Sequence, residues 1–149
     1  MKKELISAIL GSIIVLTFLY TASDKLLNFN EYVAIMKHQP LPGWSKPILI
    51  WLIPFSEILT SVLLFLPKTR LVGFAAATLL MLLFTGYVGL VLLHALKYFP
   101  CICGGIFRSI TWEKHFVINI ILLSIAVAGV IIDKINIHKS KAGGNVKLA

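Results

Sequence analysis

Four long apolar stretches constrain this chain more than any other feature of its sequence. A helix needs about 20 mostly apolar residues to cross a bilayer. Because the hydrocarbon interior tolerates no unpaired backbone, each stretch must be a helix or a strand of a closed barrel. None shows the alternating polarity of barrel strands. The sequence therefore predicts an all-α integral membrane four-helix bundle. Its spans cover residues 5–22, 48–66, 71–96 and 115–132.

The composition supports the same class. Hydrophobic residues make up 58% of the 149 residues and charged residues only 13%, whereas a soluble domain carries about 25% charged residues. A chain of this length forms one compact unit. We expect a four-helix transmembrane domain over residues 1–133, followed by a basic cytoplasmic tail over residues 134–149.

The first apolar stretch has two interpretations. Met1, Lys2 and Lys3 precede it, as basic residues precede the apolar core of a signal peptide. The stretch is long for such a core, however, and no A-x-A cleavage site follows it. We therefore expect a retained transmembrane helix, with a signal peptide as the alternative.

The basic charges indicate lipid rather than nucleic acid as a partner. The formal net charge is +8, which attracts either of these polyanions. No cluster of Lys and Arg lies in an independent soluble segment, and no nucleic-acid recognition motif is present. Charges beside apolar stretches face lipid headgroups. The lipid bilayer is the expected partner, and no nucleic-acid partner is expected.

The distribution of these charges predicts an orientation. Eight Lys and Arg lie in the N-terminus, the second connection and the tail, and six lie in the first and third loops. The eight are more densely placed, and cytoplasmic segments carry the excess of basic residues. We expect both termini in the cytoplasm, which places residues 24–47 and 97–114 outside it.

The first outer loop contains a short helical pattern. Leu26, Phe29, Val33 and Met36 recur at steps of three and four residues, which is the spacing of one helix face. The proline-containing segment 39–43 ends the pattern, because proline lacks a backbone donor. A short amphipathic helix lying at the membrane interface is expected here.

Two cysteines in the third loop carry the strongest chemical signal. Cys101 and Cys103 are separated by one residue and followed by two glycines. A disulfide between them would close a small, strained ring, and strain makes a disulfide easier to reduce. A predicted extracytoplasmic position suits oxidising chemistry. The pair indicates a thiol–disulfide relay, although two such cysteines can equally be inert small residues of a loop.

One acidic residue lies in the middle of the second span. A charge there costs about 2.5–3.5 kcal/mol, so Glu57 should face the bundle interior with a partner or a proton. One interpretation makes Glu57 the partner of a proton or of a quinone hydroxyl. The other makes it a neutral, hydrogen-bonded clasp between helices. The sequence leaves both open.

Two histidines flank the cysteine loop. His94 and His115, together with Cys101 and Cys103, form a donor set that zinc or copper accepts, but the spacing matches no zinc finger or ribbon. An imidazolium could instead lower the pKa of a thiol. We favour histidines at the membrane interface and assign no metal. Asn119, one turn after His115, is expected to hydrogen-bond with another helix.

Four short segments, taken together, resemble one family. They are SDKLLNF after the first span, PFSEIL in the second, CICGG in the third loop and the pattern W-x-x-H-x-x-x-N that opens the fourth. Their order and spacing are similar to those of the methylamine-utilisation MauE family, within the DoxX-like group of small four-helix membrane proteins. The resemblance covers nearly the whole chain.

The resemblance implies an accessory role in the bacterial cytoplasmic membrane. The MauE family is associated with maturation of a disulfide-rich periplasmic dehydrogenase subunit, alongside a thioredoxin-like exported partner. Carried onto this chain, Cys101 and Cys103 are the implied redox pair, and Glu57 is the acid of the second-helix motif. DoxX-like relatives include quinone-linked oxidation of thiosulfate, so quinone is an implied cofactor.

The leading hypothesis is thus a membrane thiol–disulfide oxidoreductase or maturation accessory protein that uses Cys101 and Cys103, with Glu57 and a histidine managing protons. The first alternative is a non-enzymatic scaffold or chaperone subunit for an exported protein. The second is a carrier of a metal or small solute that uses the thiols and histidines.

Overall fold

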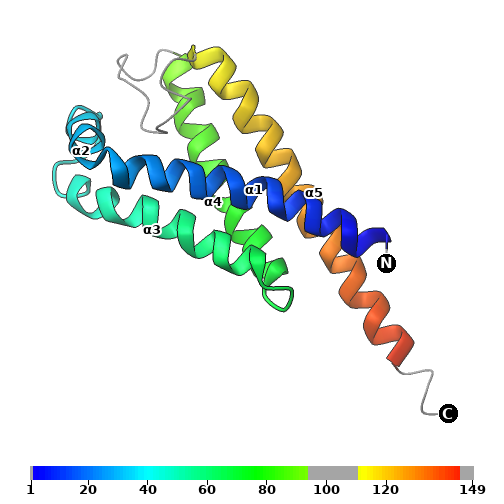
Figure 1. The fold of residues 1–149 in the computed structure, drawn as a ribbon. Helices are drawn as coiled ribbons and strands as arrows, with labels where there is room; N and C mark the ends of the chain where they lie inside the picture. The colour runs from blue at the N-terminus through cyan, green and yellow to red at the C-terminus, as the bar shows by residue number, and fades with distance from the viewer. Residues whose placement is uncertain (1, 94–110, 145–149) are drawn as a thin grey trace.

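All regular secondary structure in the described part of the chain is helical (Figure 1). The computed structural model describes the backbone of residues 2–93 and 111–144, and the side chains of residues 4–93, 111 and 113–137. The helices are α1 (Lys2–Leu27), α2 (Phe29–Lys37), α3 (Lys46–Phe65), α4 (Arg70–Leu92) and α5 (Trp112–Gly144).

Four of these helices are long and apolar enough to cross a membrane. The apolar spans run over Glu4–Leu27, Lys46–Phe65, Arg70–Leu92 and Glu113–Ile137. The prediction of an all-α four-helix membrane bundle is therefore confirmed. The short helix expected in the first outer loop is also present, as α2.

The helices extend beyond the apolar stretches at several ends. Helix α1 continues past residue 22 to Leu27, because its buried face continues through the polar residues that follow. Helix α5 continues to Gly144 and crosses the expected boundary at residue 133. The division into a membrane domain and a tail stays a prediction.

Each spanning helix packs against the next one in the chain, and α5 closes the bundle against α1. The short connection between α3 and α4, from Phe65 to Arg70, is of the kind that joins antiparallel neighbours. The ends of α1 and α4 and the beginnings of α3 and α5 lie at the same end of the bundle as α2 (Figure 1). We call this the α2 end, and the opposite one, where α1 begins, the N-terminal end.

Apolar side chains cover the outside of the bundle, and many polar ones lie inside. Leu16, Trp51 and Leu83 are each more than 60% exposed, whereas Ser7, Thr60 and other polar residues are buried. Lipid tails are as apolar as leucine, so spanning helices associate through close packing and interhelical polar contacts. This distribution is the one expected for a bundle surrounded by lipid.

The interior is packed around two groups of side chains. Ile14 and Phe18 of α1, Phe74 and Met81 of α4 and Ala126 of α5 belong to the central one. A second group, Tyr32, Met36 and Ile50, joins α2 to α3. The Tyr87 hydroxyl also donates a hydrogen bond to the Gln39 side-chain oxygen, which fixes the turn after α2 against α4.

Helices α3 and α4 approach most closely at Gly73. A Cβ at this position would lie 2.7 Å from the backbone nitrogen of Leu64. No side chain can move aside to relieve that contact, because the atom it meets belongs to the backbone. Gly86, on the same helix, has nothing within 4 Å of the corresponding position.

Gly73→Ala should therefore destabilise the bundle by about 1–3 kcal/mol, the usual effect of overpacking. Gly86→Ala is the matched control and should be neutral or slightly stabilising, since alanine favours a helix by up to about 1 kcal/mol over glycine. Unfolding of the purified protein in mixed detergent micelles measures both. Equal stability of the two variants would contradict the close approach of α3 and α4.

Candidate functional site

A buried ion pair joins α1 to α3. The Lys25 Nζ donates hydrogen bonds to both carboxylate oxygens of Glu57, at 2.6 and 2.9 Å. Each residue is only 2% exposed. The Thr21 hydroxyl donates to the Phe18 carbonyl at 3.1 Å and also interacts with the Glu57 carboxylate. Glu57 thus has the inward-facing position and the partner that its place in the span required.

Lys25 reaches this position because α1 continues its buried face. Ile14, Phe18, Thr21 and Lys25 follow one another at steps of four, three and four residues, and all are buried. The sequence analysis counted Lys25 among the charges of the first outer loop, and the structure corrects this. With Lys25 in the interior, the expected outer loops carry fewer basic residues. The predicted orientation does not depend on Lys25 and stays a prediction.

The two charges of the pair compensate each other where water is scarce. Burying either charge alone would be costly, and only close, well-formed hydrogen bonds offset the lost hydration. Glu57 therefore joins two helices, as the second interpretation expected. Its partner is the charged ammonium group of Lys25, whereas that interpretation expected a neutral hydrogen bond. The part of Glu57 in proton or quinone chemistry stays a prediction.

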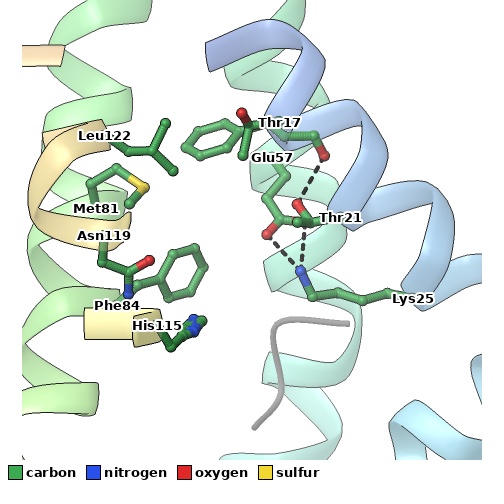
Figure 2. Close-up of a pocket in the computed structure, with 10 residues that line it drawn as sticks. Thr17, Thr21, Lys25, Glu57, Met81, Phe84, His115, Asn119 and Leu122 are labelled. Carbon is green, nitrogen blue, oxygen red and sulfur yellow. Dashed lines mark hydrogen bonds and ion pairs between the residues drawn. The ribbon is translucent and has the colours of Figure 1, made fainter. Parts of the chain in front are cut away.

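A small cavity lies between this ion pair and α5. Its volume is about 30 Å³. About 10–15 Å³ suffices to hold one water. Phe18, Met81, Phe84 and Leu122 form much of its apolar wall. Figure 2 shows Lys25 and Glu57 on one side of this space and the polar residues of α5 on the other.

His115 and Asn119 are the polar residues that α5 contributes to the cavity (Figure 2). They lie one turn apart on one face of the helix and are 2% and 5% exposed. The Asn119 side-chain nitrogen is buried without a hydrogen-bond partner in the part of the chain that the structure describes. This nitrogen is a donor at the cavity, and the expected hydrogen bond of Asn119 with another helix stays a prediction.

The structure brings together three of the residues singled out in the sequence, Glu57, His115 and Asn119, around one cavity. His94, Cys101 and Cys103 lie outside the described residues, so their roles stay predictions. The described chain ends at Leu93 and resumes at Thr111, both at the α2 end (Figure 1). Thr111, the first described residue after the cysteine segment, precedes His115 by four residues, about one helical turn.

The described residues hold no group of three or more His, Cys, Asp and Glu that could bind a metal ion. The zinc or copper alternative requires His94 and the two cysteines, which lie outside these residues. It is therefore untested by the structure.

Lys25 and Thr21 are the residues that sequence analysis missed. A signal was available, because Lys25 continues the helical spacing of the buried apolar face and stands inside the segment SDKLLNF. An acid in the middle of one span also requires a partner from another span. This signal was missed because the first span was taken to end with the apolar stretch at residue 22, before Lys25.

Comparison with known families gives one result. The family described as methylamine utilisation protein MauE matches residues 3–132. The match contains α2, α3 and α4 completely, α1 except its first residue, and the first two-thirds of α5. No curated protein and no solved structure matches the chain.

Lys25→Met should destabilise the bundle by about 3–5 kcal/mol, because it leaves the Glu57 carboxylate buried without its counter-charge. The double variant Lys25→Met, Glu57→Leu removes both charges and should recover most of that loss. Unfolding in mixed micelles again provides the measurement.

The control for this pair is Lys37→Met, which removes an exposed lysine of α2. Its effect should stay within about 0.5 kcal/mol. If Lys25→Met were as mild as Lys37→Met, or if the double variant were as unstable as Lys25→Met, the ion pair would not hold α1 against α3.

Proposed function

Because the chain belongs to the MauE family of methylamine utilisation proteins, we propose that it is a membrane thiol–disulfide protein in the maturation of an exported protein. The family match supports an accessory membrane protein in methylamine utilisation. The redox step is assigned to Cys101 and Cys103, the only two cysteines of the chain.

The proposed reaction is thiol–disulfide exchange with a thioredoxin-like exported partner. A thiolate of one protein attacks the disulfide of the other and forms a mixed disulfide, with one partner sulfur leaving as a thiolate. The second thiol of the attacking protein then displaces the remaining partner sulfur. One dithiol is oxidised and one disulfide is reduced, so two electrons and two protons change carrier without any further reactant.

The observation that carries this proposal is the position of the two helix ends that flank the cysteine segment in the chain. In the chain this segment joins α4 to α5, and the described residues on either side of it, Leu93 and Thr111, lie at the α2 end of the bundle (Figure 1). The charge distribution predicts that this end faces the outside of the bacterial cytoplasmic membrane, with both termini in the cytoplasm. An exported partner would meet the cysteines there, in a compartment where disulfides persist.

The cavity beside the first two turns of α5 supports a role for protons. Thiol–disulfide exchange requires a thiolate, and a thiol loses its proton more readily beside a base. His115 is buried in the first turn of α5, and Glu57 lies across the cavity from it (Figure 2). We assign His115 as the group that exchanges protons with the cysteine segment. Glu57 holds Lys25 and contributes a carboxylate to the lining of the cavity.

A quinone is the second candidate in this scheme, as the membrane carrier that accepts or supplies the two electrons. The cavity favours it in one respect, because an unpartnered amide donor stands beside apolar and aromatic walls inside the bundle. The cavity of about 30 Å³ is too small for a quinone ring, so only a hydrogen-bond-accepting oxygen of the quinone would enter it.

A scaffold subunit without redox chemistry is the competing function. The buried ion pair favours it in one respect, since a clasp between helices requires no reaction. The two functions differ in their dependence on the thiols.

Replacing one cysteine should trap the partner. With Cys103→Ser, a mixed disulfide formed at Cys101 lacks the resolving thiol and should accumulate, and Cys101→Ser should do the same for Cys103 if the partner reaches it. The double variant should form no adduct and should lose function in maturation of the exported protein. Non-reducing electrophoresis and mass spectrometry of the adduct provide the readout.

Thiol labelling in intact cells is the accompanying control. A membrane-impermeant maleimide should label Cys101 and Cys103 after reduction if they face outward, and the double serine variant should remain unlabelled. If the double variant matures the exported protein as well as the parent chain does, the scaffold function replaces the redox proposal.

His115→Ala should slow exchange at the cysteines by about a hundredfold, the lower range for loss of a positioned acid–base group. Lys114→Ala, the exposed neighbour in the same turn, is the matched control and should exchange at the parent rate. Stopped-flow measurement of the purified protein with a small disulfide reports both rates. Equal rates at several pH values would assign His115 a structural role only.

A further inference from the structure

A second concave surface lies at the N-terminal end of the bundle, away from the ion pair. It consists of two adjoining cavities that share Ala8 and Arg70. One, here called the polar cavity, has a volume of about 600 Å³ and is bordered by charged and apolar residues of α1, α4, α5 and the turn before α4. The other has a volume of about 440 Å³ and is bordered mainly by apolar residues of α1 and α3.

Arg70 is the cation at the junction of these cavities. Its Nε is buried and has no hydrogen-bond partner among the described residues. A charged group at the edge of the hydrocarbon is costly unless it meets a counter-charge. Lys68 lies exposed on the border of the same cavity. These side chains present two positive charges toward it.

The first turn of α4 adds backbone donors at the same place. The hydroxyl of Thr69, the residue before α4, donates to the Leu63 carbonyl at 2.9 Å and makes no capping hydrogen bond. The first N–H groups of a helix have no partner within it and favour an anion. They add to the charges of Arg70 and Lys68.

Two carboxylates border the polar cavity as well. Glu4 extends from α1 and Asp133 from α5, where Asp133 also accepts a hydrogen bond from the Ser7 hydroxyl. The polar cavity therefore contains two cationic and two anionic side chains. A ligand that complements this arrangement carries a negative and a positive group close together.

The second cavity continues from Arg70 along an apolar path. Gly11, Val15 and Leu16 of α1 form one side of it, and Leu64 and Phe65 of α3 form the other. From Ala8 to Leu16 the path measures about 12 Å, at about 1.5 Å per residue of helix. It extends along α1 from the N-terminal end of the bundle toward the middle of the bundle.

We propose that this surface binds one phospholipid of the ethanolamine class. The phosphate lies against Arg70 and Lys68, the ammonium group lies against Glu4 and Asp133, and one acyl chain follows the apolar path. The site is independent of the cysteines and of the proposed thiol chemistry. It would hold the N-terminal end of α1 against the turn between α3 and α4.

Native mass spectrometry of the full chain in detergent tests this site, with phosphatidylethanolamine, phosphatidylcholine and phosphatidylglycerol as probes. The parent chain should retain phosphatidylethanolamine most strongly. Arg70→Gln should weaken its binding about tenfold or more, the effect of losing a charge-assisted hydrogen bond. Ser12→Phe, which fills the apolar path, should weaken it comparably.

Lys114→Gln is the matched control, since it removes one positive charge at the α2 end, and it should bind the lipid as the parent does. Lys68→Gln, at an exposed position, provides a second test that does not alter packing. Glu4→Gln should weaken phosphatidylethanolamine but not phosphatidylglycerol.

Three outcomes would overturn the proposal. The first is equal lipid binding by Arg70→Gln and Lys114→Gln. The second is tighter binding of phosphatidylglycerol than of phosphatidylethanolamine by the parent chain, which would exclude the carboxylates from the site. The third is equal affinity for soluble glycerophosphoethanolamine, which would make the apolar path irrelevant.

Discussion

The rest of the structure depends on the ion pair between Lys25 and Glu57. In a bundle surrounded by lipid, apolar burial gives the helices little reason to associate, so interior polar contacts carry a larger share of specificity. This pair fixes α1 against α3 and compensates two charges that could not be buried separately. It also sets the rotation of α1, because the face that carries Lys25 also carries Ile14 and Phe18 into the core.

The cavity between the ion pair and α5 follows from that rotation of α1. With Lys25 and Glu57 turned inward, the first two turns of α5 place His115 and Asn119 on the facing wall (Figure 2). These turns follow the cysteine segment directly in the chain. The proposed redox site and the interior polar groups are thus joined by chain connectivity at one end of the bundle. The proposed lipid site lies at the other end.

The sequence predicted the parts of the site that depend on local pattern. An acid in the middle of a span had to face inward, and Glu57 does so. His115 and Asn119 stood one turn apart and share the cavity. Lys25 was misplaced because hydropathy ended the first span before it, whereas the helix and its buried face continue. Arg70 and Asp133, far apart in the chain, showed no common pattern at all.

The sequence by itself determined the membrane class, the helical content and the family, because hydrophobic length, backbone hydrogen bonding and short motifs are local properties. The tertiary structure alone decided which residues meet. A partner for Glu57, a shared cavity for residues of α1, α3, α4 and α5, and a mixed-charge surface at the N-terminal end all require helices distant in sequence to be packed in one rotation and register. The rotation and register of each helix depend on how its side chains fit those of its neighbours. One stretch of sequence does not specify that fit.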